Sequence, residues 1–332
     1  MAGRATNLAL LVLLPAAAVS GAATFLVGSG IVGIVVTVHG IVGLMLLVLL
    51  PWKSVIARRG LRRRRADRLI SLVLAAAVLL ALASGLAHST GLLIRAGGLT
   101  ALQVHVGAAL VALVPLLGHV LRRRVRPRKT DLSRRAVLRA GMLVAAATAG
   151  YGALELAARA LSLPGARRRA TGSYELSSGD PDGMPTTSWL FDETPPIDPA
   201  GWRLTVRSGG ASRDWTVDEI GAVGDHASVI LDCTGGWYSR QVWSGARLSR
   251  LLPVGSAGSV VVVSATGYRR ALPLSDDLLL AVEVAGRPLS DGHGAPIRLV
   301  VPGRRGYHWV KWVTQVEHQA SPWWAESPLP LQ

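Results

Sequence analysis

Hydrophobic residues dominate the first half of the chain in long, nearly uninterrupted segments. Each of four such segments is close to the length of about 20 residues that an α-helix needs to cross a hydrocarbon core about 30 Å thick. The pattern therefore predicts four transmembrane helices, at Leu8–Val27, Ile31–Leu50, Leu69–Ala87 and Leu99–Val120.

A fifth, weaker apolar segment follows at Ala140–Leu161, interrupted by Glu155 and Arg159. It comes directly after "LSRRAVLRAG", residues 132–141, which resembles a twin-arginine export signal. The alternative is that Arg134 and Arg135 only add positive charge to the inner side of the membrane. Both interpretations place everything after about residue 163 on the outer face, and both leave open whether the fifth helix is retained or cleaved.

The pattern of polar and apolar positions changes after residue 173. Short β-branched runs such as "WRLTV", "HASVIL", "SVVVVSATG" and "IRLVVPG" alternate with turns rich in Gly, Pro, Asp and Ser, which is typical of strands. We therefore expect an all-α transmembrane bundle over residues 1–125, a basic segment with a fifth helix over 126–170, and a strand-rich α+β domain over 171–332.

The distribution of charge decides how these parts face the membrane. The chain is 50% hydrophobic and has a formal net charge of +16. Its basic residues crowd into Lys53–Arg68 and Leu121–Arg135, each between two apolar segments, as in the cytoplasmic loops of membrane proteins. We therefore expect a multi-pass protein in the cell membrane, in contact with lipid, with a cytoplasmic N-terminus and an extracytoplasmic C-terminal domain. This pattern argues against a nucleic-acid surface.

Cys233 is the only cysteine of the chain, so no disulfide can form within it. It stands at the end of an apolar run and is followed by Thr234, two glycines and Trp237. Four roles remain open from the residues alone: a buried small hydrophobe, an intermolecular bridge, a nucleophile or a metal ligand.

Two blocks around and after this cysteine are informative together. They are "DCTGGWYSRQVWSGARLSRLL", residues 232–252, and "DGHGAPIRLVVPGRRGYHWVKWV", residues 291–313. Both resemble blocks of the sulfite oxidase family of molybdopterin enzymes, in the same order, and the resemblance covers nearly all of Thr187 to His318. It implies a sulfite-oxidase-type molybdopterin-binding fold and an oxidoreductase with a molybdenum–molybdopterin cofactor.

The resemblance also implies roles for individual residues. Cys233 would be the molybdenum ligand and the catalytic residue, because a thiolate is a soft ligand that suits such a metal. The implied cofactor-binding residues are Thr187, Trp189, His293, Arg298, His308, Trp309 and Lys311. Without the motif, Cys233 would be interpreted as an inert core residue, and Arg298 and Lys311 as solvated charges at strand ends.

The family's substrate is a small molecule, and the sequence departs from the family pattern in two respects. The residues after Cys233 lack the arginines that hold sulfite in true sulfite oxidases, and His308 stands where another arginine occurs, although Arg240, Arg304 and Arg305 could supply positive charge. We also expect no room after His318 for the family's immunoglobulin-like domain. In both respects the sequence is closer to the bacterial periplasmic methionine-sulfoxide reductase branch.

Histidines in the predicted helices suggest a second redox centre. His39 and His105 begin intervals of the same length, ending at Lys53 and His119, within what looks like a diverged internal repeat. We expect His39 and His105 at similar depth in the outer half of the membrane, where two facing imidazoles can hold one haem b. The alternative is a hydrogen-bonded pair of helices. His88, at the outer end of its helix, is either an alternative ligand or an interface residue.

Together these features predict a membrane-anchored molybdopterin-dependent oxidoreductase that transfers electrons through a membrane haem to or from a quinone or a redox partner protein. A different class of protein stays open: a membrane-anchored binding or sensory module that kept the fold without the metal.

Overall fold

The computed structural model describes residues 3–28, 30–63, 68–96, 99–122, 128–188, 192–253, 256 and 258–327. The chain divides into two compact units. The helical unit comprises residues 1–25 and 30–172, and the C-terminal unit comprises residues 26–29 and 173–332. The division between Gly172 and Ser173 lies next to the predicted boundary at 170, and the basic segment with the fifth helix groups with the helical unit.

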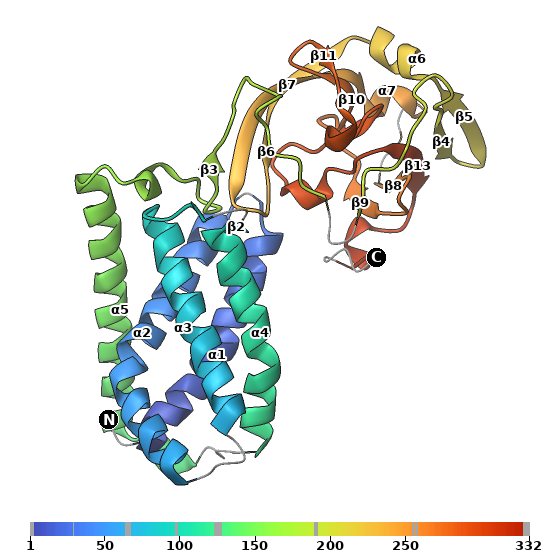
Figure 1. Cartoon of the computed structure of the whole chain (residues 1–332). Coiled ribbons are helices and arrows are strands. Elements are labelled where there is room, and N and C mark those ends of the chain that lie inside the picture. The colour runs from blue at the N-terminus through green and yellow to red at the C-terminus, as the bar shows by residue number, and fades with distance from the viewer. Residues whose placement is uncertain are drawn as a thin grey trace. The chain divides into compact units, whose positions relative to one another are not determined.

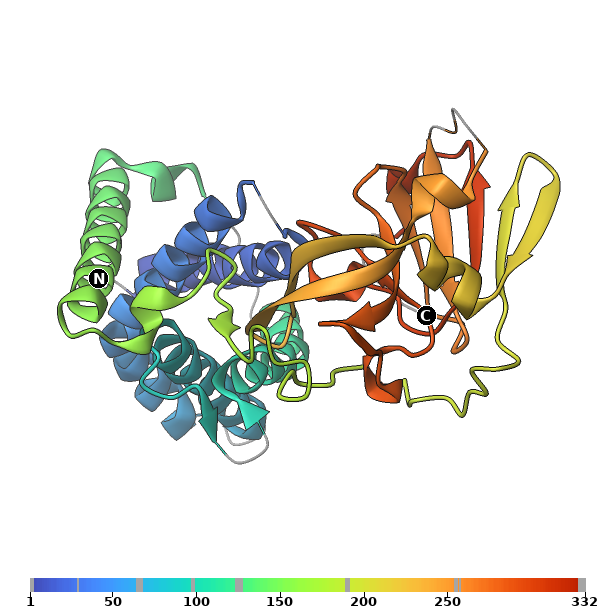
Figure 2. The same ribbon diagram turned by 90° about the horizontal axis from the view of Figure 1, so that it is seen from above.

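The helical unit contains five long helices among its described residues, shown in Figure 1. All five are long and apolar enough to cross a membrane. Helix α3 packs along α4, and α5 lies on the outside of the group against α2 (Figure 2). A two-stranded hairpin, β1 (Arg95–Ala96) with β2 (Leu99–Thr100), connects α3 to α4. The helices are α1 (Gly3–Leu26), α2 (Val32–Arg63), α3 (Arg68–Thr90), α4 (Ala101–Arg122) and α5 (Arg134–Ala160).

Two of the helices, α2 and α5, begin or end well beyond the apolar segments that predicted them. Helix α2 continues past Leu50 to Arg63, because backbone hydrogen bonds hold a helix together whether its side chains are apolar or charged. Helix α5 begins at Arg134 because the Ser133 hydroxyl accepts the N–H of Ala136 (3.3 Å) and caps its first turn. Hydropathy therefore located the apolar parts of α2 and α5 and missed the charged end of each, whereas the segment predicted from Leu99 began too early, because Leu99 and Thr100 form β2.

Helix α5 packs as an integral part of the helical unit. Its Leu143 packs against an apolar cluster formed by Leu13, Leu46 and Leu49. Gly40 lies under the ring of Tyr151 so closely that a Cβ at Gly40 would be 2.6 Å from the ring. In the segment before α5, Asp131 accepts two hydrogen bonds from Arg4, at 2.8 and 2.7 Å.

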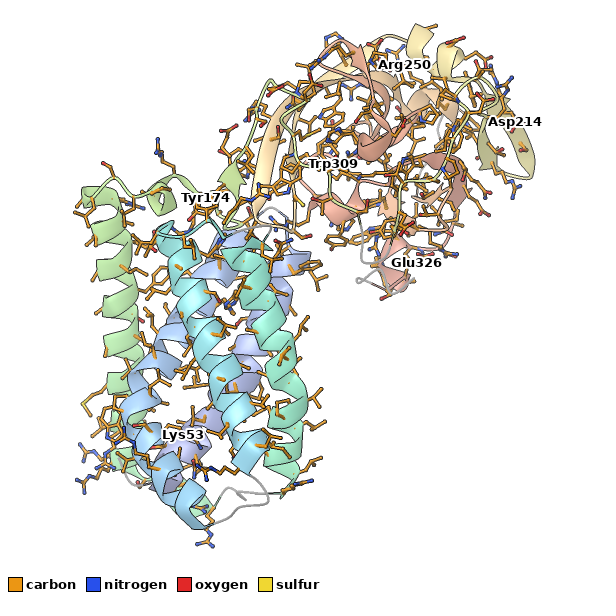
Figure 3. All side chains as sticks on the ribbon, in the orientation of Figure 1. Lys53, Tyr174, Asp214, Arg250, Trp309 and Glu326 are labelled. Atoms are coloured by element: carbon orange, nitrogen blue, oxygen red, sulfur yellow. The ribbon has the colours of Figure 1, made fainter. Side chains whose placement is uncertain are left out.

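Large apolar side chains cover the outside of these helices, including Val114 at 79% exposure and Leu69 at 72%. An exposed apolar area of this extent would be unfavourable in water and suits contact with lipid. Basic side chains gather at the end of the unit that carries Lys53 (Figure 3).

The C-terminal unit is strand-rich, as the alternation of apolar runs and turns predicts. Its short helical elements are α6 (Val217–Ala222), α7 (Leu248–Leu251), η3 (Asp291–His293), η4 (Gly306–His308) and η5 (Trp323–Ala325). Its strands are β3 (Tyr174–Glu175), β4 (Leu204–Ser208), β5 (Ala211–Trp215), β6 (Asp225–Asp232), β7 (Trp237–Arg247), β8 (Ser259–Ser264), β9 (Arg269–Pro273), β10 (Leu279–Val284), β11 (Arg287–Pro288), β12 (Arg298–Val300) and β13 (Val313–Gln319).

These strands form two sheets. One is built around the long strand β7, which pairs with β3, β6 and β10, while β11 and β12 pair with β10. The other has the order β5-β4-β13-β8-β9, in which β13 runs parallel to β4 and antiparallel to β8. Both sheets contribute to one hydrophobic core, with Trp243, Leu280, Val262 and Val316 at 0% exposure. Burial of such side chains is the main term that stabilises the unit.

A tight turn between β6 and β7 carries the single cysteine. The two strands pair up to Asp232 and Tyr238, which leaves residues 233–237 to reverse the chain. Gly236 has φ +89°, a conformation that glycine adopts without strain. The hairpin thus holds Cys233 at the end of a strand whose register is set by eight consecutive pairs.

Candidate functional sites

A cleft in the C-terminal unit brings together residues that are far apart in the sequence. Its walls come from the loop before β4, from the turn that carries Cys233, and from the stretch between η3 and β13. Six predicted site residues line this cleft: Thr187, Cys233, His293, Arg298, Trp309 and Lys311. Figure 3 shows Trp309 within the unit.

The Cys233 backbone is fully hydrogen-bonded, so the direction of its side chain is well defined. Its N–H donates to the carbonyl of Trp237 (2.8 Å), and its carbonyl accepts the N–H of Gly236 (3.2 Å). The Gly235 N–H points at the sulfur, at 3.3 Å from Sγ. Burial raises the pKa of the Cys233 thiol, while this N–H and the Thr187 side chain act against that rise. A bound metal cation would supply the positive charge that a thiolate in this environment needs.

Arg298 carries a guanidinium into the interior of the unit. It is 3% exposed, and burial lowers its pKa to about 10. Its Nη1 donates to the carbonyl of His293 (3.0 Å), and its charge lies over the rings of Trp243 and Trp309 at 5.4 and 5.5 Å. Its buried Nε has no hydrogen-bond partner among the described residues. The arrangement leaves a desolvated cation with an unused donor beside the cleft.

Lys311 and His293 complete this wall of the cleft. The Lys311 ammonium donates to the carbonyl of Gly292 (2.5 Å), and burial, followed by the charge of Arg298, lowers its pKa to about 7. His293 is fixed through both ring nitrogens, Nδ1 to the Ser290 hydroxyl (2.8 Å) and Nε2 to the carbonyl of Met184 (3.1 Å). Burial lowers the pKa of His293, so its ring is neutral at pH 7.

Two predicted cofactor-binding residues are not part of the described lining. His308 is buried with its ring against Tyr307, at 4.1 Å between centroids, and the cleft is lined by its neighbours Tyr307 and Trp309. Burial lowers the pKa of His308 to about 3. His308 is thus not among the residues that line the cleft, and its role in binding the cofactor stays a prediction. Trp189 lies outside the described residues.

Arg305 has a different place from the one considered for it. The sequence left it among the arginines that could hold an anionic substrate, but it forms a buried ion pair with Asp232. No sequence pattern pointed to this pair, because the two residues are far apart along the chain and Asp232 looks like an ordinary strand-end residue. Tyr268, Asp192 and Ser264 also line the cleft and were not predicted.

In the helical unit, His39 on α2 and His105 on α4 lie side by side, with ring centroids 5.8 Å apart. His105 Nδ1 is 2.7 Å from the carbonyl oxygen of Ala81, an acceptor only, so Nδ1 carries the proton. His39 Nδ1 is 3.0 Å from the Ser20 hydroxyl, which donates its own proton to the Ala16 carbonyl. Both imidazoles are thus held with Nδ1 as the donor and Nε2 as the nitrogen with a free lone pair.

Glycines make room beside both rings. A Cβ at Gly85 would lie 2.8 Å from His105 Nδ1, and one at Gly21 would lie 3.2 Å from His39 Cε1. The two glycines stand at matching positions of the internal repeat. His88 is engaged elsewhere, since its Nε2 is 2.9 Å from the carbonyl oxygen of Gly172. Both residues belong to the helical unit, so the contact lies within that unit.

Comparison with known proteins shows what the C-terminal unit is similar to. Residues 192–325 match the family model described as the oxidoreductase molybdopterin binding domain. The mitochondrial sulfite oxidase of Drosophila melanogaster is 29% identical over 159 residues, 37% of this chain and 28% of that protein. The human enzyme is 30% identical over 165 residues, 38% of this chain and 30% of that protein.

Other similarities are shorter or weaker. The NADH nitrate reductase of Volvox carteri is 38% identical over 73 residues, 20% of this chain and 8% of that protein. The crystal structure of the sulfane dehydrogenase SoxCD from Paracoccus pantotrophus is 22% identical with a TM-score of 0.35, covering 39% of this chain and 40% of that one. The chain spans less than a third of the length of the curated relatives it matches. Residues 192–325 are therefore similar to the molybdopterin-binding domains of oxidoreductases, and parts of the chain are similar to sulfite oxidases and nitrate reductases.

Proposed function

We propose that this protein is a membrane-anchored molybdopterin-dependent oxidoreductase whose reaction takes place in the cleft at Cys233. The observation that carries the proposal is the convergence of a buried thiol, Arg298 and Lys311 on one cleft of an oxidoreductase domain. When bound there, the molybdenum–pterin cofactor would supply two-electron chemistry of the oxygen-atom-transfer type.

The residues of the cleft fit this cofactor. Cys233 would hold the metal, because its thiol opens into the cleft and its raised pKa calls for a nearby cation. Arg298 and Lys311 would hold the phosphate of the pterin, Arg298 through the Nε that has no partner among the described atoms and Lys311 as a point charge. Trp309 Nε1 is a further buried donor without a partner in the described part of the chain, available to an acceptor of the pterin.

The wall around Cys233 favours a neutral substrate over sulfite. Trp237, Tyr268 and Tyr307 line the cleft, and the charge of Arg305 is committed to Asp232. An anion would therefore find few free cations once Arg298 and Lys311 are engaged by the pterin. This supports an apolar oxidised substrate such as a sulfoxide, the substrate class of the periplasmic methionine-sulfoxide reductase branch.

The histidine pair of the helical unit supports an electron connection. His39 and His105 would be the two ligands of a haem b, since each has a free Nε2 and a hydrogen-bonded Nδ1, the arrangement that orients a ligating imidazole. The closeness of the two rings, with centroids 5.8 Å apart, supports a shared ligand. The haem would carry electrons singly between the C-terminal unit and a membrane quinone or a redox partner protein.

The proposed topology follows from the same chain. Five membrane crossings with both basic loops inside would put the N-terminus in the cytoplasm and the C-terminal unit outside. The twin-arginine-like segment would serve the export of that unit in a folded state, with its cofactor in place. The packing of Leu143 and Tyr151 of α5 against the other helices supports a fifth helix that stays attached.

Elemental analysis of the detergent-purified chain tests the proposal. Protein from a host that makes the pterin cofactor should contain about one molybdenum per chain, and Cys233→Ser should lose activity on sulfoxides. No molybdenum, in a preparation where a control molybdoenzyme is fully loaded, would refute the enzyme and favour the binding-module alternative.

A parallel spectrum tests the haem. Protein made with sufficient haem should show the α and β absorption bands of a reduced b-type cytochrome. His39→Ala and His105→Ala should each abolish them while the molybdenum content is unchanged. Wild-type protein without these bands would refute the electron connection and leave the molybdenum site unaffected.

A further inference from the structure

A buried ion pair lies directly behind Cys233. Arg305, at the start of η4, and Asp232, at the end of β6, are 2% and 4% exposed. Arg305 Nη1 bonds Asp232 Oδ1 at 2.5 Å, and the two backbones form an isolated parallel bridge. The second nitrogen of the same guanidinium, Nη2, donates to the carbonyl oxygen of Cys233 at 3.2 Å. One arginine thus holds both the predicted metal ligand and the residue before it.

Ser173 joins the pair from a third segment. Its hydroxyl donates to Asp232 Oδ1 (2.7 Å) and accepts from Arg305 Nη1 (3.3 Å), and the Ser173 side chain is fully buried. Ser173 comes from the segment before β3 and Arg305 from the segment between β12 and β13, so two distant parts of the chain contact the cysteine turn. We call Arg305, Asp232 and Ser173 the cysteine clamp.

None of the three clamp residues is among the residues that line the cleft. All three are also buried, so we infer that they act on the cleft through the Cys233 turn. Stability alone does not explain them, because replacing a buried ion pair by apolar residues of similar volume is often neutral or stabilising. What an apolar pair could not do is donate a hydrogen bond to the Cys233 carbonyl.

We propose that Arg305 is a positioning residue that, held by Asp232 and Ser173, orients Cys233 toward the metal and sets the electronic environment of the metal–sulfur bond. The inference rests on the proposed function, because it concerns the role of Cys233 as a ligand. Outer hydrogen-bonding partners of metal ligands have such effects in general, and their loss typically reduces affinity or activity about 10–100-fold.

The physical reason lies in geometry and charge. The Cys233 carbonyl accepts from both Arg305 and Gly236, and its N–H donates to Trp237, so the Cα–Cβ direction follows from bonds on every side. Removing the Arg305 bond frees one side of the turn. It also removes a positive charge close to the sulfur. Positive charge stabilises the more negative, reduced state of a metal–thiolate centre relative to its oxidised state.

Arg305→Gln tests the inference, with Arg304→Gln as the matched control. Arg304 is the neighbouring arginine and lies over the ring of Trp323, at 5.0 Å, with no hydrogen bond described to the cysteine turn. Three quantities are compared with wild type: molybdenum content, the electron paramagnetic resonance spectrum of the half-reduced molybdenum centre, and its midpoint potential. We expect Arg305→Gln to keep molybdenum, change the spectrum, shift the potential and lower kcat about 10–100-fold, whereas Arg304→Gln resembles wild type in all of these.

Two more variants separate positioning from folding. Arg305→Lys keeps a charge beside Asp232 without the two-pronged bond, so it should restore stability while the spectrum stays altered. Ser173→Ala keeps the ion pair and should change the spectrum in the same direction by a smaller amount. If Arg305→Gln fails to fold, these two variants still decide the question.

The outcomes also distinguish the two proposals. The positioning role is overturned if molybdenum-loaded Arg305→Gln has the same spectrum and potential as loaded wild type. If Arg305→Gln does not fold, the same result for Arg305→Lys and Ser173→Ala overturns it. In both cases the proposed function still stands. Wild-type protein without molybdenum overturns both.

Discussion

Replacing Arg298 by methionine should affect the cofactor far more than the fold. Arg298 is almost completely buried, and burial lowers its pKa from 12.5 to about 10. At 1.36 kcal/mol per unit, keeping this guanidinium charged costs the cofactor-free protein roughly 3 kcal/mol. The variant relieves this cost and loses the charged hydrogen bond to the His293 carbonyl, worth about 1.5–3 kcal/mol. The two terms nearly cancel, so we expect cofactor-free Arg298→Met to be within about 1–2 kcal/mol of wild type.

The loaded protein should behave differently. A ligand present at about 1,000 times its Kd stabilises the folded state by about 4 kcal/mol, and much of that binding depends on an anion meeting a cation that burial has already stripped of water. Cofactor-loaded wild type should therefore be clearly more stable than its cofactor-free form, and Arg298→Met should show little such difference and little molybdenum.

Intrinsic fluorescence during urea unfolding, with and without cofactor, measures both quantities, because nine of the ten tryptophans follow residue 172. Arg240→Met, which removes an exposed arginine from β7, is the control and should match wild type in both states. Arg298→Met that loses more than about 3 kcal/mol without cofactor yet still binds a full complement of molybdenum would show that Arg298 is structural and refute the reasoning.

Three further changes have directions that follow from the structure. Burial lowers the pKa of His308 from 6.5 to about 3, so as the pH falls the unfolded chain binds a proton at this residue before the folded protein does. At pH values below 6.5 the free energy of unfolding should therefore decrease by up to about 1.4 kcal/mol per pH unit. Urea unfolding of His308→Phe between pH 7 and pH 4.5 should show a shallower decrease than wild type. An unchanged slope would contradict the buried neutral ring. Gly85→Ala places a methyl group against His105 and should remove the haem absorption bands while molybdenum is retained. The matched change Gly107→Ala on α4, where nothing lies within 4 Å of the new carbon, should leave them intact, and equal spectra for the two variants would count against the histidine pair as a haem site. Gly245→Ala brings a Cβ to 2.0 Å from the carbonyl oxygen of Leu280, so thermal unfolding should show a loss at or above the upper end of about 1–3 kcal/mol; a smaller loss would mean that β7 and β10 separate easily.

Hydropathy and motif order carried the sequence analysis a long way. Length and apolarity located five candidate spans, since crossing a hydrocarbon core imposes a requirement that a linear pattern displays directly. The two motif blocks led to the molybdopterin-binding domain, which the family model confirms for residues 192–325. The pairing of His39 with His105 was also expected from their equal intervals, because a repeat places equivalent residues at equivalent depth.

The sequence did not reveal contacts that depend on the three-dimensional path of the chain. Asp232 and Arg305 are 73 positions apart, and only the pairing of β6 with β7 and the course of η4 bring them together. His308 was assigned to the cofactor from its place in a motif, but the direction of a side chain in a short 3₁₀ turn cannot be read from the order of residues. Motif position predicted the stretch of chain that lines the cleft, whereas His308 itself is not among the lining residues.

The start of the C-terminal unit matters for anyone who wishes to produce it as a separate fragment. Strand β3 pairs in parallel with the first residues of β7, Tyr174 with Trp237 and Glu175 with Tyr238, immediately after the cysteine turn. The recognised domain begins only at residue 192, so a fragment cut there would lose this strand together with Ser173. Such a fragment would keep both sequence motifs but would leave β7 with an unpaired edge next to Cys233. A soluble version of the domain should therefore begin before Ser173, at the last residues of the helical unit.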